Sequence, residues 1–213
     1  MTEAVKKKKQ TQNMVMTAAF AALIILLAFT PGLGYIPLGV INATTIHIPV
    51  ILGALVLGPK YGAVLGGVFG LTSLINNSFI NPGITSFVFS PFVSGGGVRS
   101  IIICFIPRIL IGVVAYYVFV GIKKLLKNKK GSVSVALVVA GVAGSLTNTL
   151  LVMNGIFVLF GEQYGAATGH TSGLYAFILG IIGTNGVPEA IVAGIISLAA
   201  GQALFALRKS LKF

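Results

Sequence analysis

Long runs of apolar residues, separated by short polar or glycine-rich stretches, dominate the pattern along the chain. Runs of this length are typical of helices that cross a membrane rather than of amphipathic helices on a soluble protein. The pattern predicts six spans, at residues 14–30, 45–57, 61–75, 100–120, 133–160 and 187–207. We therefore expect an all-α integral membrane bundle in which residues 1–213 form a single domain, with residues 1–13 as its basic N-terminal segment.

The second and third spans are shorter than the ~20 residues that a helix needs to cross a bilayer. Gly58, Pro59 and Lys60 predict a tight turn between them. A re-entrant hairpin is therefore a competing interpretation. The segment that follows, 76–98, contains no Lys or Arg, which places it outside the cell. This favours six full spans, or a hairpin that enters the membrane from outside, and we prefer six.

The charged residues are few and unevenly placed. Only 8% of the residues are charged, against roughly a quarter in soluble domains, so lipid must cover most of the surface. The net charge is +12, yet all of the 15 Lys and Arg residues except Arg99 and Arg108 flank or separate the apolar runs. The positive-inside rule then predicts cytoplasmic termini in a multi-pass protein of the cell membrane. No polar domain remains that could bind nucleic acid.

The connections predicted to lie outside are residues 31–44, 76–99 and 161–186. They are long and rich in Gly, Asn, Ser, Thr and Pro, whereas the inner connections are short and basic. Long polar loops on one face of a small bundle indicate that this face performs recognition. Within the third connection, residues 175–182 are apolar and predict a short helix. The first basic and apolar run resembles a signal peptide but lacks a small-x-small cleavage site, so we expect an uncleaved first span.

The inventory of reactive side chains is too small for most enzymes. The chain has no aspartate, and its acids are Glu3, Glu162 and Glu189. Metal-dependent phosphotransfer and acid-dyad hydrolysis need clustered carboxylates, and no Gly-Lys-Ser/Thr loop is present to bind ATP. Cys104 is the single cysteine, so no intrachain disulfide can form. We expect no enzyme activity, no metal and no cofactor.

Several polar residues lie at membrane depth, where polarity is costly and usually functional. These are His47, Arg99, Arg108, Asn148, Asn154 and Glu189. Most fall in the outer half, which predicts a polar cup that opens outward above an apolar floor, rather than a continuous pore. Pro107 frees a backbone carbonyl in the fourth span.

Each of these residues also has a purely structural interpretation. Arg108 and Glu189 could form a buried ion pair, and the asparagines could be hydrogen-bonded between helices. His47 could be an interfacial histidine and Arg99 an anchor at the membrane surface.

Small residues at four-residue spacing allow helices to approach closely. Ala18 and Ala22 show this spacing in the first span, and Gly62, Gly66 and Gly70 show it in the third. We expect the glycines to pack internally.

The chain resembles the substrate-binding S-components of energy-coupling factor (ECF) vitamin transporters over essentially its whole length. Besides the two alanines, the resemblance rests on IPLGVINATTIHIP (36–49), LGPKYG (57–62), FIPRIL (105–110), TNTLL (147–151) and NGVPEA (185–190). The resemblance implies six helices, cytoplasmic termini and substrate binding at the external face, under the loop that follows the first span. It also implies a transmembrane coupling subunit that contacts Ala18 and Ala22, and two cytoplasmic ATPases whose ATP-driven rearrangement topples the S-component to deliver substrate.

The segment 38–47 looks most like S-components for pantothenate, with pyridoxine, folate and riboflavin as alternatives. On this hypothesis Arg99 or Arg108 holds the substrate carboxylate, and residues 31–44 act as a lid. Hydrogen bonds would come from Asn42, His47, Asn148, Asn154, Asn185 and Glu189. A stand-alone transporter driven by protons through Glu189 is the alternative from another class, and a membrane enzyme or protease is the third.

Overall fold

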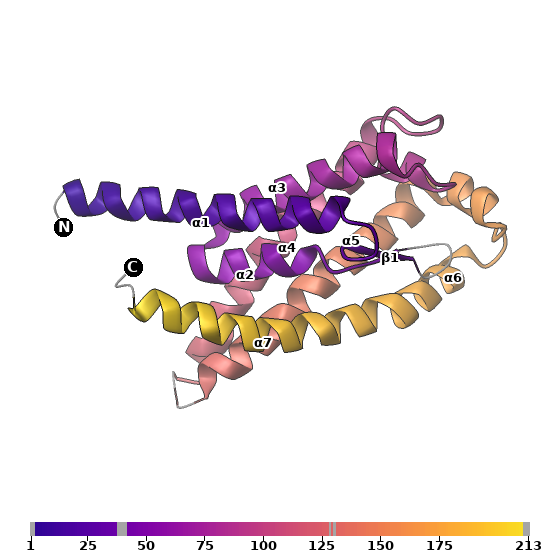
Figure 1. Ribbon diagram of the computed structural model, residues 1–213. Coiled ribbons are helices and arrows are strands. Elements are labelled where there is room, and N and C mark those ends of the chain that lie inside the picture. Colours follow the sequence, from indigo (N-terminus) through magenta and orange to yellow (C-terminus); the bar gives the residue numbers. More distant parts are fainter. Residues whose placement is uncertain (1–2, 38–41, 128, 130, 211–213) are drawn as a thin grey trace.

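The apolar runs form helices that lie side by side in an elongated bundle (Figure 1). This computed structural model describes residues 3–37, 42–127, 129 and 131–210. The elements are α1 (Glu3–Phe29), β1 (Tyr35–Pro37), β2 (Asn42–Thr44), α2 (His47–Leu57), α3 (Pro59–Ile75), η1 (Asn76–Ile80), η2 (Ser86–Val88), α4 (Val98–Leu125), α5 (Ser132–Thr168), α6 (Leu174–Ile181), η3 (Ile182–Gly186) and α7 (Val187–Ser210). Strands β1 and β2 pair antiparallel in a small hairpin, in which Tyr35 lies opposite Thr44.

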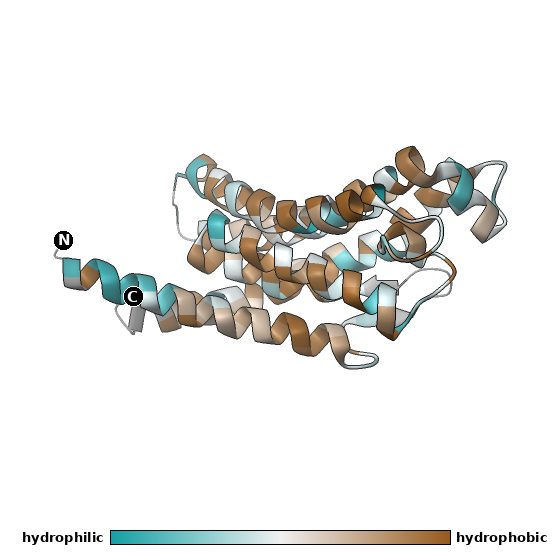
Figure 2. Cartoon of the chain, turned by 90° about the horizontal axis from the view of Figure 1, so that it is seen from above, coloured by the Kyte–Doolittle hydropathy of each residue, from teal (hydrophilic) through white to brown (hydrophobic). Residues whose placement is uncertain are grey.

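Within the described residues, five helical stretches are long and apolar enough to cross a membrane, namely Val5–Phe29, Pro59–Ile80, Val98–Leu125, Ser132–Thr168 and Leu174–Leu207. Their outward faces carry large apolar side chains that only lipid or another apolar surface can cover, and Figure 2 shows hydrophobic residues along most of the bundle. The chain is therefore a multi-pass helical membrane protein. Helix α2, with 11 residues, is shorter than these stretches.

Helix α2 occupies the centre of the bundle. Residues 47–56 are all buried, and α2 packs against α1, α3, α4, α5 and α7. This explains why its sequence is apolar all round, since no side of the helix meets lipid or water. Together with its neighbours it forms an apolar core that includes Ile51, Leu55, Leu65, Ile111 and Phe119. An apolar core thus fills this part of the bundle.

The glycine face of α3 lies directly against α4. A methyl group on Gly62 would meet the Cα of Gly112 at 3.1 Å, and one on Gly70 would meet the carbonyl oxygen of Cys104 at 3.0 Å. A methyl group on Gly66 would collide with the backbone of Arg108. These contacts confirm that the glycines pack internally.

The third predicted outer connection is largely helical instead of irregular. Helix α5 continues to Thr168, eight residues past its predicted end, and stops where Gly169 adopts a positive φ of 74°. The predicted short helix at 175–182 is confirmed as α6. The π-helix η3 then joins α6 to α7, and the π-helix η1 likewise prolongs α3 beyond the predicted end of the third span. The polar asparagines in these segments were compatible with a loop, but backbone hydrogen bonds continue through them.

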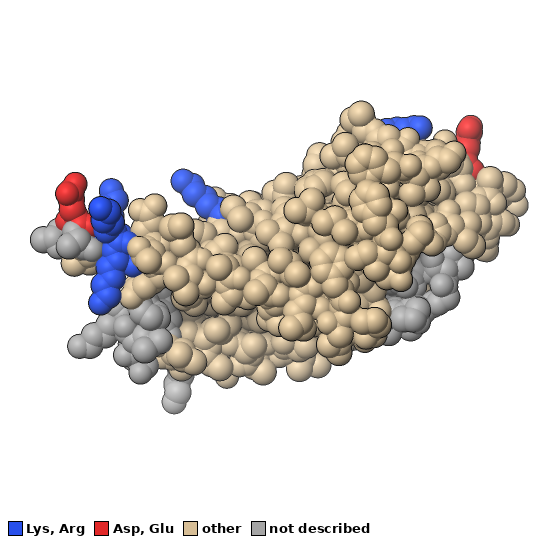
Figure 3. Space-filling view, turned by 45° about the horizontal axis from the view of Figure 1, so that its top comes forward, with Lys and Arg blue, Asp and Glu red and all other residues tan. Residues whose placement is uncertain are grey.

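Both termini lie at the same end of the bundle, and so does the turn between α4 and α5 (Figure 1). On the face seen in Figure 3, most Lys and Arg side chains gather at this end, while the long middle of the face shows no charged side chain. The β-hairpin, η2 and α6 lie toward the opposite end.

Candidate functional site

A cavity of about 120 Å³ lies among α3, α4, α5, α7, the two π-helices and the β-hairpin. A single water molecule needs ~10–15 Å³ of such space, so the cavity is about ten times larger. On one side it borders the apolar core around α2, through Phe69. On the other side it borders a second apolar cluster, through Val152, Met153 and Ile156. The polar side chains between these clusters make this the candidate site.

Arg108 is the cation of the cavity, and the sequence around it explains its position. Pro107 has no N–H, so the carbonyl of Ile103 one turn earlier loses its helical partner. The Arg108 guanidinium donates to this carbonyl oxygen at 2.7 Å. The rings of Phe69 and Phe89 also lie 5.5 and 5.0 Å from the guanidinium carbon, within cation–π range. The predicted free carbonyl thus holds the guanidinium in place.

Arg108 is 6% exposed, and it makes no ion pair with any described residue. Its Nε atom is buried and has no hydrogen-bond partner among the described residues. The interpretation as an ion pair with Glu189 is wrong for the described residues, because Arg108 donates to the Ile103 carbonyl and Glu189 accepts from Thr44 instead. A buried guanidinium without a counter-ion is costly unless an anion reaches it. The cavity therefore suits a ligand that carries a negative group.

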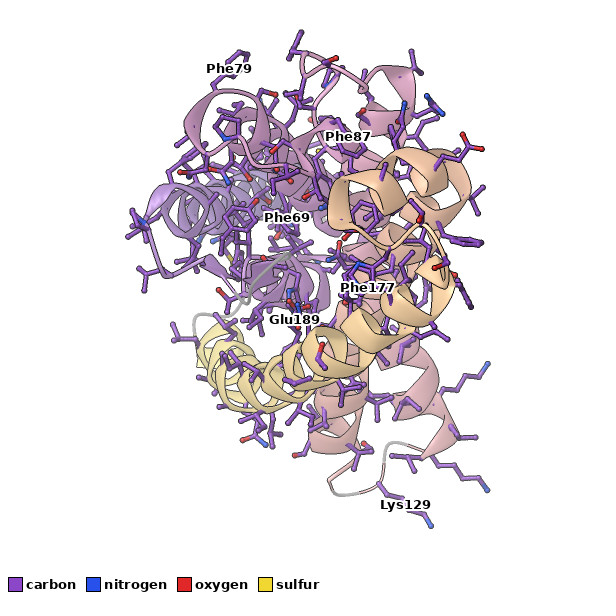
Figure 4. The ribbon with its side chains drawn as sticks, turned by 90° about the vertical axis from the view of Figure 1, so that its right-hand side faces the viewer. Phe69, Phe79, Phe87, Lys129, Phe177 and Glu189 are labelled. Atoms are coloured by element: carbon purple, nitrogen blue, oxygen red, sulfur yellow. The ribbon has the colours of Figure 1, made fainter. Side chains whose placement is uncertain are left out.

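Glu189 lines the cavity from the first turn of α7. Its Oε1 accepts the backbone N–H of Thr44 at 2.6 Å, and its Oε2 accepts the hydroxyl of Thr149 at 3.4 Å. Seen from the end opposite the termini, Glu189 and Phe69 lie toward the middle of the bundle, on α7 and α3 (Figure 4). In the described part of the chain, the bond from Thr44 joins the β-hairpin to α7.

The π-helix η1 contributes amides that the sequence interpretation missed. Asn76 and Asn77 line the cavity from η1, Asn81 lines it from the position directly after η1, and Ser73 from α3. The Asn81 side chain donates to Asn76 Oδ1 at 2.9 Å, and Asn77 Nδ2 donates to the Ser73 carbonyl at 2.9 Å. π-Helical turns are rare and frequently occur at functional sites. A run of asparagines directly after an apolar helix was the available signal, but the prediction placed it in a loop.

Two predicted asparagines reach the cavity from other elements. Asn148 on α5 is buried, and its Oδ1 has no hydrogen-bond partner in the described part of the chain. Asn185 lines the cavity from the second π-helix, η3.

Tyr35, on β1, adds a phenol that was not predicted. Its hydroxyl oxygen is buried beside Ser73 without forming a hydrogen bond. Burial raises the pKa of Tyr35 to about 12, so the phenol keeps its O–H donor at physiological pH.

The other predicted site residues lie elsewhere. Arg99 is exposed, donates to the Leu159 carbonyl at 2.8 Å and lies outside the cavity. Asn154 also lies outside it and donates to the Leu150 carbonyl within its own helix. His47 is 1% exposed, so it is not an interfacial histidine, and no described residue is a hydrogen-bond partner of either ring nitrogen. The side chain of Asn42 falls outside the described residues.

Ala18 and Ala22 are both exposed on α1. The same helix exposes Leu23 and Leu26, and only 11% of the residues in its apolar 18-residue stretch are buried in the bundle. This helix therefore presents a small-residue surface to its surroundings.

Comparison with known proteins places this architecture in a family. A family profile described as "ECF transporter, substrate-specific component" matches residues 12–200. The chain is 33% identical over 210 residues to the pantothenic acid transporter PanT of Lactococcus lactis subsp. cremoris, covering 96% of this chain and 99% of the relative. It is 34% identical over 202 residues to the pantothenate transporter PanT of Leuconostoc mesenteroides subsp. mesenteroides, covering 90% of each. The chain belongs to the family of substrate-specific components of ECF transporters, and is thus a transport protein rather than an enzyme.

Proposed function

We propose that this chain binds pantothenate as the substrate-specific subunit of an ECF importer. The observation that carries the proposal is Arg108, a buried cation that lines the cavity without a carboxylate partner. The names of two relatives that match nearly the whole chain support the choice of vitamin.

The chemistry of pantothenate suits the cavity. The molecule has a carboxylate at one end, an amide in the middle, and two hydroxyls beside a pair of methyl groups at the other end. A guanidinium binds a carboxylate through charge-assisted hydrogen bonds. Asn148, Asn185 and Glu189 would serve the amide and hydroxyls, while Val152 and Met153 would contact the methyl groups. Asn76, Asn77 and Tyr35 extend this proposed set.

The arrangement in the membrane is the second part of the proposal. We place α1, α2, α3, α4, α5 and α7 as six crossings with both termini in the cytoplasm, which agrees with the basic residues near the termini and near the turn between α4 and α5. The cavity would then open to the outside, with residues 31–44 as its cover, of which 38–41 lie outside the described residues. Ala18 and Ala22 would contact a transmembrane coupling subunit that acts with two ATPases, and the exposed small-residue surface of α1 supports this.

A binding experiment with a matched pair of variants tests the proposed function. The purified protein in detergent is titrated by calorimetry with pantothenate, pyridoxine, riboflavin and folate. We expect saturable binding of pantothenate alone. Arg108→Gln should weaken it roughly 30-fold or more, because losing one partner of a buried charged pair costs about 2–5 kcal/mol.

Arg99→Gln makes the same chemical change outside the cavity and should alter the affinity by no more than about twofold. Absence of pantothenate binding by the unmodified protein would refute the proposed ligand. Equal effects of the two substitutions would refute the role of Arg108. Proteoliposomes that contain this chain alone should take up no pantothenate, whereas uptake abolished by Glu189→Gln would support a proton-driven transporter.

A further inference from the structure

The two ionisable groups of the cavity lie on different walls. Arg108 lies on α4 and Glu189 lies on α7. Each of these two helices packs against α2 and α5, rather than extensively against the other. Within the described part of the chain, Glu189 is the one acidic side chain that lines the cavity. The cavity therefore has a cationic wall and an acidic wall that do not neutralise each other.

Glu189 is arranged as a hydrogen-bond acceptor. The Thr44 N–H donates to Oε1 at 2.6 Å. The Thr149 hydroxyl lies 3.4 Å from Oε2 and equally far from the Ser145 carbonyl, so these two oxygens share its one proton. A carboxylate offers about four acceptor positions, so each oxygen can accept one further hydrogen bond. A ligand hydroxyl can donate such a bond. A phosphate or carboxylate on the ligand would instead place acceptor against acceptor and charge against charge.

We propose, building on pantothenate as the ligand, that Glu189 fixes the direction of the ligand and rejects ligands with an anionic group at the hydroxyl end. The ligand carboxylate binds Arg108, and its hydroxyl end donates to Glu189. The reversed orientation would place the ligand carboxylate against Glu189 and leave Arg108 without an anion. The site thereby distinguishes the vitamin from its phosphate ester at the primary hydroxyl, which carries negative charge at both ends.

The test is a comparison of ligands across variants. Dissociation constants are measured for pantothenate, for the phosphate monoester of its primary hydroxyl, and for the uncharged acetate ester at the same oxygen. For the unmodified protein we expect the phosphate ester to bind at least 100-fold more weakly than pantothenate, and clearly more weakly than the acetate ester. Glu189→Gln should lower the ratio of the two dissociation constants, phosphate ester over pantothenate, by tenfold or more.

Two further variants separate charge from structural damage. Glu162→Gln removes an exposed carboxylate outside the cavity and should leave the ratio unchanged. Glu189→Asp keeps the charge, so it should keep the rejection of the phosphate ester even where the affinity for pantothenate falls. If the Gln variant cannot be purified, loss of this rejection in the Asp variant overturns the proposal.

The outcomes also separate this proposal from the proposed function. No binding of pantothenate by the unmodified protein would refute the function itself. Normal binding of pantothenate, with an unchanged ratio in Glu189→Gln, would refute the role of Glu189 alone. Equal rejection of the phosphate and acetate esters by the unmodified protein would show exclusion by size, which also overturns it.

Discussion

Gly66 joins the packing of the bundle to the geometry of the cavity, and replacing it with alanine tests both. A methyl group at this position would lie 2.7 Å from the carbonyl carbon of Arg108 and 2.7 Å from the Cα of Ile109. Carbon atoms in favourable contact lie about 3.5–4.0 Å apart. Because the obstacle is helix backbone rather than a flexible side chain, α3 and α4 must separate by about 1 Å.

The expected cost follows from two opposing effects. Adding a methyl group to a well-packed core typically costs about 1–3 kcal/mol. Replacing a helical glycine with alanine returns up to about 1 kcal/mol through helix propensity. We expect Gly66→Ala to lose about 1–2 kcal/mol of stability. Pantothenate affinity should also fall about tenfold, because the displaced backbone carries Arg108.

The neighbouring residue supplies the matched control. A methyl group on Gly67 would have no atom within 4 Å, so Gly67→Ala should leave affinity unchanged and gain up to about 1 kcal/mol of stability. Thermal unfolding in detergent and calorimetric titration with pantothenate measure the two effects. If both variants unfold at the same temperature and bind pantothenate equally, the close contact between α3 and α4 is not present in the protein.

Two further predictions concern the β-hairpin and α1. Tyr35→Phe should lower pantothenate affinity equally at about pH 6 and pH 9, because burial raises the Tyr35 pKa to about 12 and the phenol remains a donor throughout. Calorimetry at both pH values measures this, and an effect that disappears at the higher pH would contradict it. The double substitution Ala18→Leu and Ala22→Leu should abolish co-purification with the coupling subunit, while binding of pantothenate persists. If co-purification is intact, this surface of α1 is not the interface with the coupling subunit.

The sequence could predict which stretches are apolar membrane helices, but not which side of each helix faces inward. Arg99 and Ser100 are adjacent, yet the arginine is exposed and the serine is buried. Where lipid-facing and core-facing residues are both apolar, periodicity does not show which side of a helix faces inward. Periodicity therefore could not show that Arg108, Asn148, Asn185 and Glu189 line one cavity, whereas Arg99 and Asn154 lie outside it.

The covalent chemistry of single residues predicted one contact of the cavity that hydrophobic periodicity could not predict. Pro107 predicted an unpartnered carbonyl, and that carbonyl now fixes Arg108. The contribution of η1 could not be predicted in the same way, because its wider turn depends on bonds such as that from the Asn81 N–H to the Asn76 carbonyl. Such bonds compete closely with an ordinary helix end, and nearby tertiary packing decides between them.

The single hydrogen bond between Thr44 and Glu189 has a consequence for exchange between the bound and free states. Breaking one bond is enough to detach this small hairpin from α7 in the part of the chain that the structure describes. Opening of a lid typically takes microseconds to seconds. Opening on this scale is slow enough to affect both entry and release, so the residence time of the vitamin should depend on the contacts of the hairpin as well as on the contacts of the vitamin itself.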